Sequence, residues 1–154
     1  MNNLILRILD LAKNGEEGHV PSSLSILNIV ETLYDRFITK NKQDKFILSK
    51  GHASLALYVV LEKFKITKNL DNFCKFESNF GGHPDKNKIK GVESSTGSLG
   101  HGFPFACGVA LAKKIKKEKG KVFVLIGDGE CNEGTVWETL LLASHHKLDN
   151  LICI

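Results

Sequence analysis

The sequence lacks the features that would place the chain in a membrane, direct it to export or cross-link it with disulfides. No apolar run is long enough to cross a membrane. The amino terminus has no basic segment followed by an apolar stretch and a small-residue cleavage site. Cys74, Cys107, Cys131 and Cys153 are scattered and form no Cys-x-x-Cys pair, which argues against a zinc site or a disulfide framework. We therefore expect a cytoplasmic protein with no membrane partner.

Internal repeats and low-complexity linkers are also missing, so nothing divides the chain into separate units. Of its 154 residues, 42% are apolar and 25% are charged, which is an ordinary composition for a globular protein with room for one core. We expect a single domain over residues 1–154.

The net charge of +4 is accompanied by a dense lysine cluster. A nucleic-acid-binding patch is one interpretation, and the solvated carboxyl end of a helix is the other. The helix end is favoured because the cluster holds no aromatic residue that could stack on bases, and because Gly120 follows as a helix stop. We expect no nucleic-acid partner. The cluster consists of Lys113, Lys114, Lys116, Lys117, Lys119 and Lys121.

Helix and strand patterns alternate along the chain, which predicts an α/β fold with a parallel sheet and helices on both faces. The segment from residue 79 to 102 is rich in glycine, and a loop of this length inside a domain is usually functional or disordered. Strands are predicted at residues 46–48, 121–126 and 151–154. Helices are predicted at 3–13, from a cap at Ser22 or Ser23 through 37, after Gly51-His52 through 64, at 103–119 and at 134–147, with a short helix at 70–76.

The segment KVFVLIGDG places one carboxylate just past a predicted buried strand. Open α/β sheets bind ligands at the carboxyl ends of their strands, and glycines let the backbone come close to a phosphate. Mg²⁺ prefers one or two carboxylates together with phosphate oxygens. Asp128, between Gly127 and Gly129, is therefore a candidate ligand for a metal bridged to a diphosphate. A tight turn without a ligand is the other interpretation of the tripeptide alone.

A longer stretch around this aspartate resembles the thiamine diphosphate signature of the transketolase family. The family pattern of Gly-Asp-Gly, Glu-Gly, a helix, Lys-Leu and Asn-Leu occurs in order from residue 127 to residue 151. The resemblance implies that Asp128 ligates Mg²⁺ (or Ca²⁺ or Mn²⁺), that Asp128 and Gly129 contact the cofactor, and that Glu133 lies towards a subunit interface. Without the resemblance, Glu133 is a carboxylate facing the amino end of a helix.

Three histidines, His19, His52 and His83, each follow a glycine in a predicted turn. Imidazole suits both hydroxyl binding and proton transfer. Their contexts resemble transketolase segments, and FILSKGHASLALY around His52 is particularly similar. The resemblance implies that His52 and His83 are catalytic, that His52 also contacts the cofactor, and that His19 binds the sugar substrate. Near His19 the sequence departs from the family, because Pro21 replaces a common glycine.

The segment TGSLGHG, residues 96–102, resembles the glycine-rich cofactor loop of the family. Gly97 and Leu99 match the family pattern, whereas Ser98 replaces a frequent proline and His101 a frequent glutamine. The resemblance implies that Gly97, Ser98 and Leu99 bind the cofactor. As a bare pattern, a glycine-rich loop before a helix binds many phosphates. The departures favour a divergent or two-subunit transketolase over a one-chain enzyme.

The resemblance implies transfer of a two-carbon ketol unit between ketose and aldose phosphates, in carbohydrate metabolism. Thiamine diphosphate would carry the chemistry, and this chain would hold its diphosphate and metal. The family's second metal ligand, an asparagine past the last strand, and its pyrimidine-binding half lie outside this sequence. We expect an incomplete thiamine diphosphate-binding fold, inactive alone, that needs a C-terminal transketolase half or subunit. We also expect the complete assembly to work as a dimer.

Two alternatives remain at this point. Another thiamine diphosphate enzyme, such as 1-deoxyxylulose-5-phosphate synthase or the thiamine-dependent subunit of a 2-oxoacid dehydrogenase, would use the same site, although Glu130, Glu133-Gly134 and Trp137-Glu138 fit transketolase better. A non-catalytic remnant that binds no cofactor is the alternative from another class.

Trp137 is expected in the core, and His145 and His146 are expected to be exposed at a helix end. The sequence does not identify the sugar.

Overall fold

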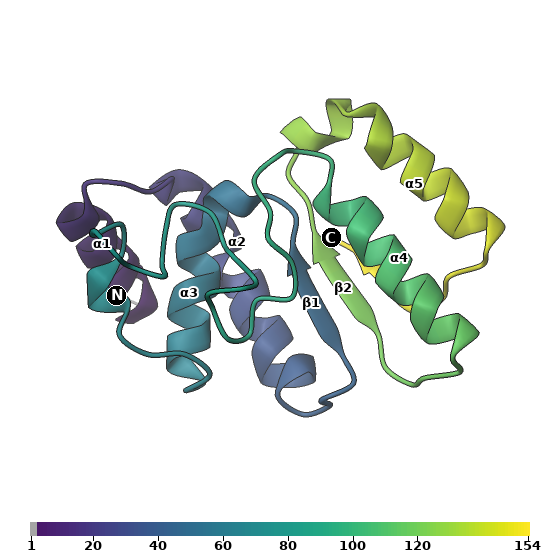
Figure 1. Cartoon of the computed structure of the whole chain (residues 1–154), viewed down its shortest axis with the longest axis horizontal. Helices are drawn as coiled ribbons and strands as arrows, with labels where there is room; N and C mark the ends of the chain where they lie inside the picture. Colours follow the sequence, from purple (N-terminus) through teal and green to yellow (C-terminus); the bar gives the residue numbers. More distant parts are fainter. Residues whose placement is uncertain (1–2) are drawn as a thin grey trace.

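Three parallel strands lie between two groups of helices in the computed structural model, which describes residues 3–154 (Figure 1). None of these helices combines the length and the apolar character needed to cross a bilayer. The strands are β1 (Lys45–Leu48), β2 (Val122–Leu125) and β3 (Leu151–Cys153). The helices are α1 (Asn3–Gly15), α2 (Val20–Leu33), α3 (Ser54–Lys63), α4 (Gly102–Ile115) and α5 (Gly134–His145). A π-helical turn covers Tyr34–Ile38, and 3₁₀ turns cover Gly51–Ala53, Leu70–Asn72 and Gly129–Asn132.

The sheet has the strand order β1-β2-β3, and both pairings are parallel. Phe46 lies opposite Phe123, which lies opposite Ile152, and all three pack against the cluster formed with α1, α2 and α3. Ile47 and Val124 face the opposite side, where they pack with α4 and α5, because successive strand residues point to opposite faces. The prediction of a parallel sheet with helices on both faces is confirmed.

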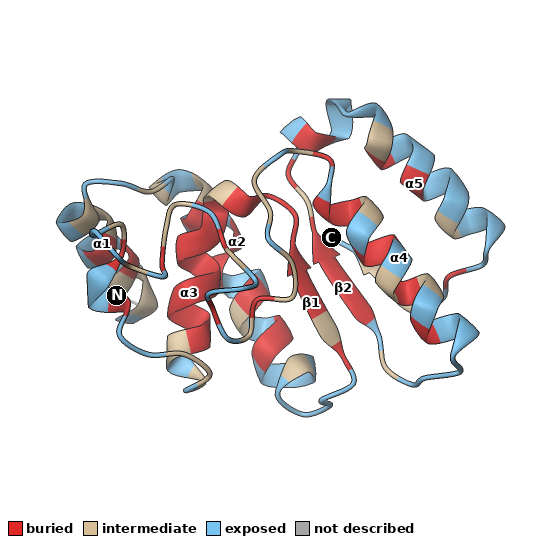
Figure 2. Ribbon diagram, in the orientation of Figure 1, coloured by how far each residue is buried: buried red, intermediate tan, exposed pale blue. Residues whose placement is uncertain are grey.

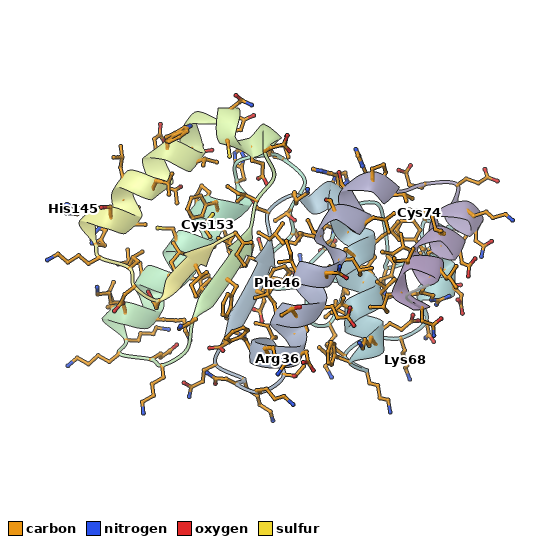
Figure 3. All side chains as sticks on the ribbon, turned by 180° about the vertical axis from the view of Figure 1, so that it is seen from behind. Arg36, Phe46, Lys68, Cys74, His145 and Cys153 are labelled. Atoms are coloured by element: carbon orange, nitrogen blue, oxygen red, sulfur yellow. The ribbon has the colours of Figure 1, made fainter. Side chains whose placement is uncertain are left out.

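The helix α3 forms the most completely buried part of the core, since every residue from Ser54 to Leu61 is buried (Figure 2). Figure 3 shows Phe46 on the side of β1 that faces this group of helices. The hydroxyl of Tyr58 donates to the carbonyl of Gly81 at 3.0 Å, and burial raises the pKa of Tyr58 well above its usual range. This bond ties the start of the glycine-rich segment to the core.

The predicted loop at residues 79–102 contains no helix or strand until α4 begins at Gly102. It packs on the core through the buried side chains of Phe80, Ile89 and Val92. The hydroxyl of Thr96 donates to the carbonyl of Leu48 at 2.7 Å, which fixes the loop to the end of β1. The loop is therefore a packed structural element that reaches from the side of α3 to the start of α4 (Figure 1).

The predicted cap of the second helix was wrong. The helix α2 begins at Val20, and the ring of His19 caps it by accepting the N–H of Ser22 at 3.3 Å. Pro21 lies in the first turn, where its fixed φ suits a helix and its missing N–H costs no hydrogen bond. The helix therefore starts before either serine, and Ser23 is buried within it.

The lysine cluster does lie at the end of a helix, but the helix is shorter than predicted. Residue Ile115 ends α4, and Lys117 then takes a positive φ of 56° that cannot continue a right-handed helix. Lys113 is buried, with its ammonium 3.8 Å from a carboxylate oxygen of Glu118. The ammonium of Lys114 binds the carbonyl of His146 at 2.9 Å, which stabilises the end of α5.

The prediction that Trp137 lies in the core was wrong. Its side chain is 59% exposed, and its indole N–H donates to the carbonyl of Cys131 at 2.9 Å. Only Val136 and Thr139 of α5 are buried. Leu140, Leu141 and Leu142 are 42%, 74% and 47% exposed, so α5 has apolar side chains on faces that nothing in the described chain covers. His145, at the outer end of α5, is exposed as predicted (Figure 3), and so is His146.

Candidate functional site

The ends of β1 and β2 bring a histidine loop and the Gly-Asp-Gly loop to the same edge of the sheet. His52 follows β1 and Asp128 follows β2, each after a few residues. The N–H of Ser49 donates to the carbonyl of Leu125 at 2.8 Å, so the parallel pairing continues up to the two loops. Neighbouring parallel strands end at one edge, where open α/β sheets bind their ligands.

A pocket of about 250 Å³ lies at this edge. It brings together five of the predicted site residues, His19, His52, Leu99, Asp128 and Gly129. Gly97, Ser98 and His83 lie outside its lining. The remaining lining residues are Ser22, Lys50, Gly127 and Glu130.

Asp128 has the free carboxylate that the metal hypothesis requires. Its side chain is exposed and makes no hydrogen bond or ion pair within residues 3–154. The backbone N–H groups of Asp128 and Gly129 also donate to no protein acceptor in this part of the chain. A carboxylate beside unpaired N–H groups suits a metal ion that shares oxygen ligands with a phosphate.

The available side chains suit a metal ion that is held jointly by the protein and a phosphate better than one held by protein side chains alone. Across residues 3–154, no group of three His, Cys, Asp or Glu side chains is placed to hold a metal ion. Mg²⁺ commonly binds through one or two carboxylates and takes its other ligands from phosphates and water. Asp128 therefore fits the protein's share of a Mg²⁺–diphosphate site.

The glycine-rich loop connects the pocket to His83. A Cβ at Gly97 would stand 3.2 Å from Cδ2 of His83, so the imidazole packs directly on a backbone without a side chain. Leu99 lines the pocket opposite the Gly-Asp-Gly loop, and a Cβ at Gly129 would meet only its Cδ1 atom at 4.0 Å. The approach to Gly129 is thus open, which is what contact with a diphosphate requires.

The three predicted histidines meet in an adjoining pocket of about 650 Å³. His19 and His52 line both pockets, with their ring centroids 5.1 Å apart, whereas His83 lines only the larger one. One compartment thus lies beside Asp128 and the other lies among the imidazoles. The arrangement places a group bound near Asp128 within reach of two of the histidines.

The ring of His19 is oriented by the helix that it caps. Its Nδ1 atom accepts the N–H of Ser22, so the proton of the neutral ring resides on Nε2. The Nε2–H group is then free to donate to a hydroxyl or phosphate oxygen. This is the chemistry expected of a residue that binds a sugar phosphate.

The environment of His52 favours its neutral form. Partial burial is the largest effect that lowers the pKa of His52 below 6.5, and the charge of Lys50 lowers it further, as do His19 and His83 when they are protonated. Glu130 acts in the opposite direction. A neutral imidazole near pH 7 can accept as well as donate a proton.

We predict that the pKa of His52 lies below 6.5 and rises when Lys50 is replaced. In Lys50→Met one nearby cation is lost, but the partial burial of His52 remains. The pKa of His52 should therefore rise towards 6.5 without reaching it. Titration of the imidazole by NMR measures both values. Since the folded chain binds this proton more weakly than the unfolded chain, the contribution of His52 to stability should be complete above pH ~6.5 and decrease as the pH falls. Lys147→Met makes the same change at an exposed position, so it is the matched control and should leave the pKa of His52 unchanged. An unchanged pKa of His52 in Lys50→Met would contradict the assigned effect of the Lys50 charge.

Sequence reasoning missed Lys50. Its side chain is only 8% exposed, lines the pocket and has no ion pair within the described residues. Its position directly after β1, just before Gly51-His52, was the available signal, because strand ends carry the ligand-binding residues of such sheets. A cation at this place favours an anionic ligand beside Asp128.

Glu133 lies outside both pockets, exposed at the amino end of α5. It makes no capping hydrogen bond with its side chain. This position is compatible with a subunit interface and with a carboxylate facing the helix dipole. Its interface role stays a prediction.

The sequence that forms these loops matches a known protein family. The model of the thiamine diphosphate binding domain of transketolase matches residues 2–154. This chain belongs to the transketolase family. The resemblance inferred from the Gly-Asp-Gly segment and the histidine turns is thereby confirmed.

The related transketolase proteins are longer than this chain. It is 38% identical to an apulose-4-phosphate transketolase subunit of Phocaeicola vulgatus, over 96% of this chain and 56% of that protein. It is 42% identical to the protein of the same name from Actinobacillus succinogenes, over 89% of this chain and 53% of that protein. The structure of transketolase from Campylobacter jejuni matches with a TM-score of 0.79 and 32% identity, over 99% of this chain and 27% of that one. The chain thus spans about half the length of these subunit relatives.

Proposed function

We propose that this chain is the diphosphate- and metal-binding part of a cytoplasmic transketolase that moves a two-carbon ketol unit between ketose and aldose phosphates. The observation that carries the proposal is the joint lining of one pocket by Asp128, Gly129, Leu99, His19 and His52. These residues come from the loops after two neighbouring strands, from the glycine-rich loop and from the start of α2. Their convergence unites a metal ligand, a phosphate-accessible backbone and proton-transferring side chains.

Each of these groups has a role that its surroundings support. The free carboxylate of Asp128 would hold Mg²⁺, and the open backbone at Gly129 and Leu99 would receive the diphosphate of thiamine diphosphate. When bound, this cofactor supplies a carbanion that attacks carbonyl groups. Gly97 and Ser98, outside the lining, would act as the part of the loop that leads to His83.

The histidines would serve the sugar. The neutral ring of His52 would exchange a proton with the oxygen of the donor carbonyl, and His83 would bind the same end of the donor from the larger pocket. The Nε2–H group of His19 would donate to an oxygen of the sugar phosphate. These roles need the histidines to face a group held near Asp128, which the shared lining of the two pockets supports.

The partner that we propose is the pyrimidine-binding half of a transketolase. The helix α5 carries exposed Trp137, Leu141 and Leu142, and Glu133 stands at its amino end. A cavity of about 470 Å³ between α5 and β3 is lined largely by apolar residues and contains none of the predicted site residues. Exposed apolar side chains gathered on one helix favour a protein interface there. The names of the two subunit relatives support a separate partner chain. We further propose that the completed assembly works as a dimer.

The substrates that we propose are sugar phosphates in carbohydrate metabolism. The two subunit relatives are named for apulose 4-phosphate. At 38% and 42% identity over this part of the protein, the donor and acceptor of this enzyme can differ from theirs. We therefore assign the class of substrate and leave the sugar to experiment.

We predict that these 154 residues catalyse no ketol transfer alone, and that activity appears in the completed enzyme, meaning this chain together with its pyrimidine-binding half. The physical reason is that one carboxylate and one set of phosphate-facing loops fix only one end of the cofactor. The purified chain and the completed enzyme are assayed with Mg²⁺, thiamine diphosphate, a ketose phosphate and an aldose phosphate. Product formation is followed by mass spectrometry.

Three results would overturn parts of this proposal. Sustained turnover by a monodisperse preparation of the chain alone would refute the need for a partner. Turnover of a 2-oxoacid by the completed enzyme, without ketol transfer, would favour the alternative thiamine diphosphate enzymes. Absence of cofactor binding in the completed enzyme would favour a non-catalytic remnant.

A further inference from the structure

The carboxylate of Glu130 is fully buried and accepts three hydrogen bonds. Its Oε1 atom accepts the hydroxyl of Ser49 at 2.6 Å and the N–H of Gly100 at 2.9 Å. Its Oε2 atom accepts the N–H of Gly127 at 2.9 Å. Burying a carboxylate is unfavourable unless its oxygens are satisfied, and here both oxygens are.

The three donors belong to three different segments of the site. Ser49 follows β1 and precedes the turn of His52, Gly100 belongs to the glycine-rich loop, and Gly127 opens the Gly-Asp-Gly loop. One side chain therefore joins three of the segments that meet at the pocket. No other side chain within residues 3–154 bonds all three.

Gly100 is held from both sides. Its N–H donates to Glu130, and its carbonyl accepts the hydroxyl of Thr135 at 2.8 Å. Its φ of +76° lies in the left-handed region, and a Cβ would stand 2.6 Å from Oγ1 of Thr135. The backbone of the glycine-rich loop is therefore fixed at this point against the segment that follows the Gly-Asp-Gly loop.

We propose that Glu130 is a positioning residue that sets the separation of the glycine-rich loop and the Gly-Asp-Gly loop before the cofactor binds. This inference rests on the proposed function, because it assigns both loops to the diphosphate. Fixing the loops in advance removes the cost of ordering them when the ligand arrives, so it increases affinity without any contact to the ligand.

A direct role in holding the diphosphate does not fit Glu130. An ionised carboxylate only accepts hydrogen bonds and repels phosphate oxygens. Although the residue lines the pocket, both of its carboxylate oxygens are already occupied by protein donors. A role as simple core filling does not fit either, because an apolar side chain of equal volume would leave the N–H groups of Gly100 and Gly127 unpaired.

The central variant is Glu130→Gln, which keeps the size of the side chain. An amide has one acceptor oxygen, so its NH₂ group must face the N–H of either Gly100 or Gly127. Hydrogen exchange of the full chain without cofactor should show faster exchange at one or both of these amides. In the completed enzyme, the Kd of thiamine diphosphate at fixed Mg²⁺ should rise about tenfold to a hundredfold, while kcat at saturating cofactor should change less than about threefold.

Two further variants separate positioning from general stability. Thr135→Val removes only the bond to the carbonyl of Gly100, and it should raise the same Kd in the same direction by about threefold to tenfold. Glu118→Gln is the matched control, because Glu118 is exposed and precedes β2 at the edge of the sheet away from the pocket. In this variant the Kd of thiamine diphosphate and the exchange rates of both amides should stay unchanged.

Unchanged exchange at both amides together with an unchanged Kd in Glu130→Gln would overturn the proposal, whatever happens to the melting temperature. Faster exchange with an unchanged Kd would overturn the proposal too. The loops would then be less firmly held, yet the affinity for thiamine diphosphate would not depend on it. If the unmodified completed enzyme binds thiamine diphosphate but transfers no ketol unit, the proposed function fails while the exchange and Kd results still decide the role of Glu130.

Discussion

Replacing Asp128 by asparagine should remove Mg²⁺-dependent binding of thiamine diphosphate from the completed enzyme. The exposed carboxylate of Asp128 has no protein partner within residues 3–154, so it is free to ligate a metal ion. Asparagine keeps the shape and one oxygen but loses the negative charge that a hard divalent cation prefers. Loss of groups that only support a metal ligand already weakens binding ten- to a hundredfold, so loss of the ligand charge itself should weaken it by at least about a hundredfold.

Isothermal titration calorimetry with and without Mg²⁺ measures this effect. Asp10→Asn makes the same change at an exposed position on α1. This variant should bind thiamine diphosphate with the Mg²⁺-dependent affinity of the unmodified protein. Asp128→Asn should also keep the fold, because the side chain makes no contact that the fold needs. An unchanged Mg²⁺-dependent affinity in Asp128→Asn would show that the metal is held elsewhere.

The fold followed from the sequence because its signals are local. Buried strands such as residues 122–125 show as short apolar runs, and helices show as apolar residues at helical spacing. Boundaries were less accurate where a single backbone angle decided them. The positive φ of Lys117 ends α4 before the lysine cluster is complete, and no residue type at that position signals it.

The site was predicted in its loops but not in its supporting contacts. A carboxylate between glycines and a histidine after a glycine both have recognisable local patterns, and the structure brings Asp128 and His52 into one pocket. Glu130 and Lys50 were missed as site residues because their roles depend on distant partners. The bond between Glu130 and Ser49 joins residues that are far apart in the sequence, and no local pattern predicts such a pair.

The error at Trp137 has a different cause. A helix with apolar residues on all sides is expected to be buried on all sides. The prediction assumed that this chain alone would bury it, whereas the described residues cover α5 only through Val136 and Thr139. The exposed leucines of α5 are explained if the missing cover comes from the partner half that we propose.

Replacing His52 by alanine should lower kcat of the completed enzyme by about a hundredfold or more, which is the usual contribution of a positioned proton-transfer group. The Kd of thiamine diphosphate should change much less, because the carboxylate of Asp128 and the backbone at Gly129 remain in place. His83→Ala should behave in the same way, with a still smaller effect on Kd, since His83 lines only the larger pocket.

Comparison of kcat with Kd in the same preparation distinguishes a catalytic role from an anchoring role. His145→Ala is the matched control, because this histidine is exposed at the far end of α5 and should leave both quantities unchanged. Equal losses in kcat and in cofactor affinity for His52→Ala would assign this side chain to holding the diphosphate. A large loss of kcat with cofactor affinity nearly intact requires that the imidazole act on the sugar, which is the role that its neutral form and its place beside His19 support.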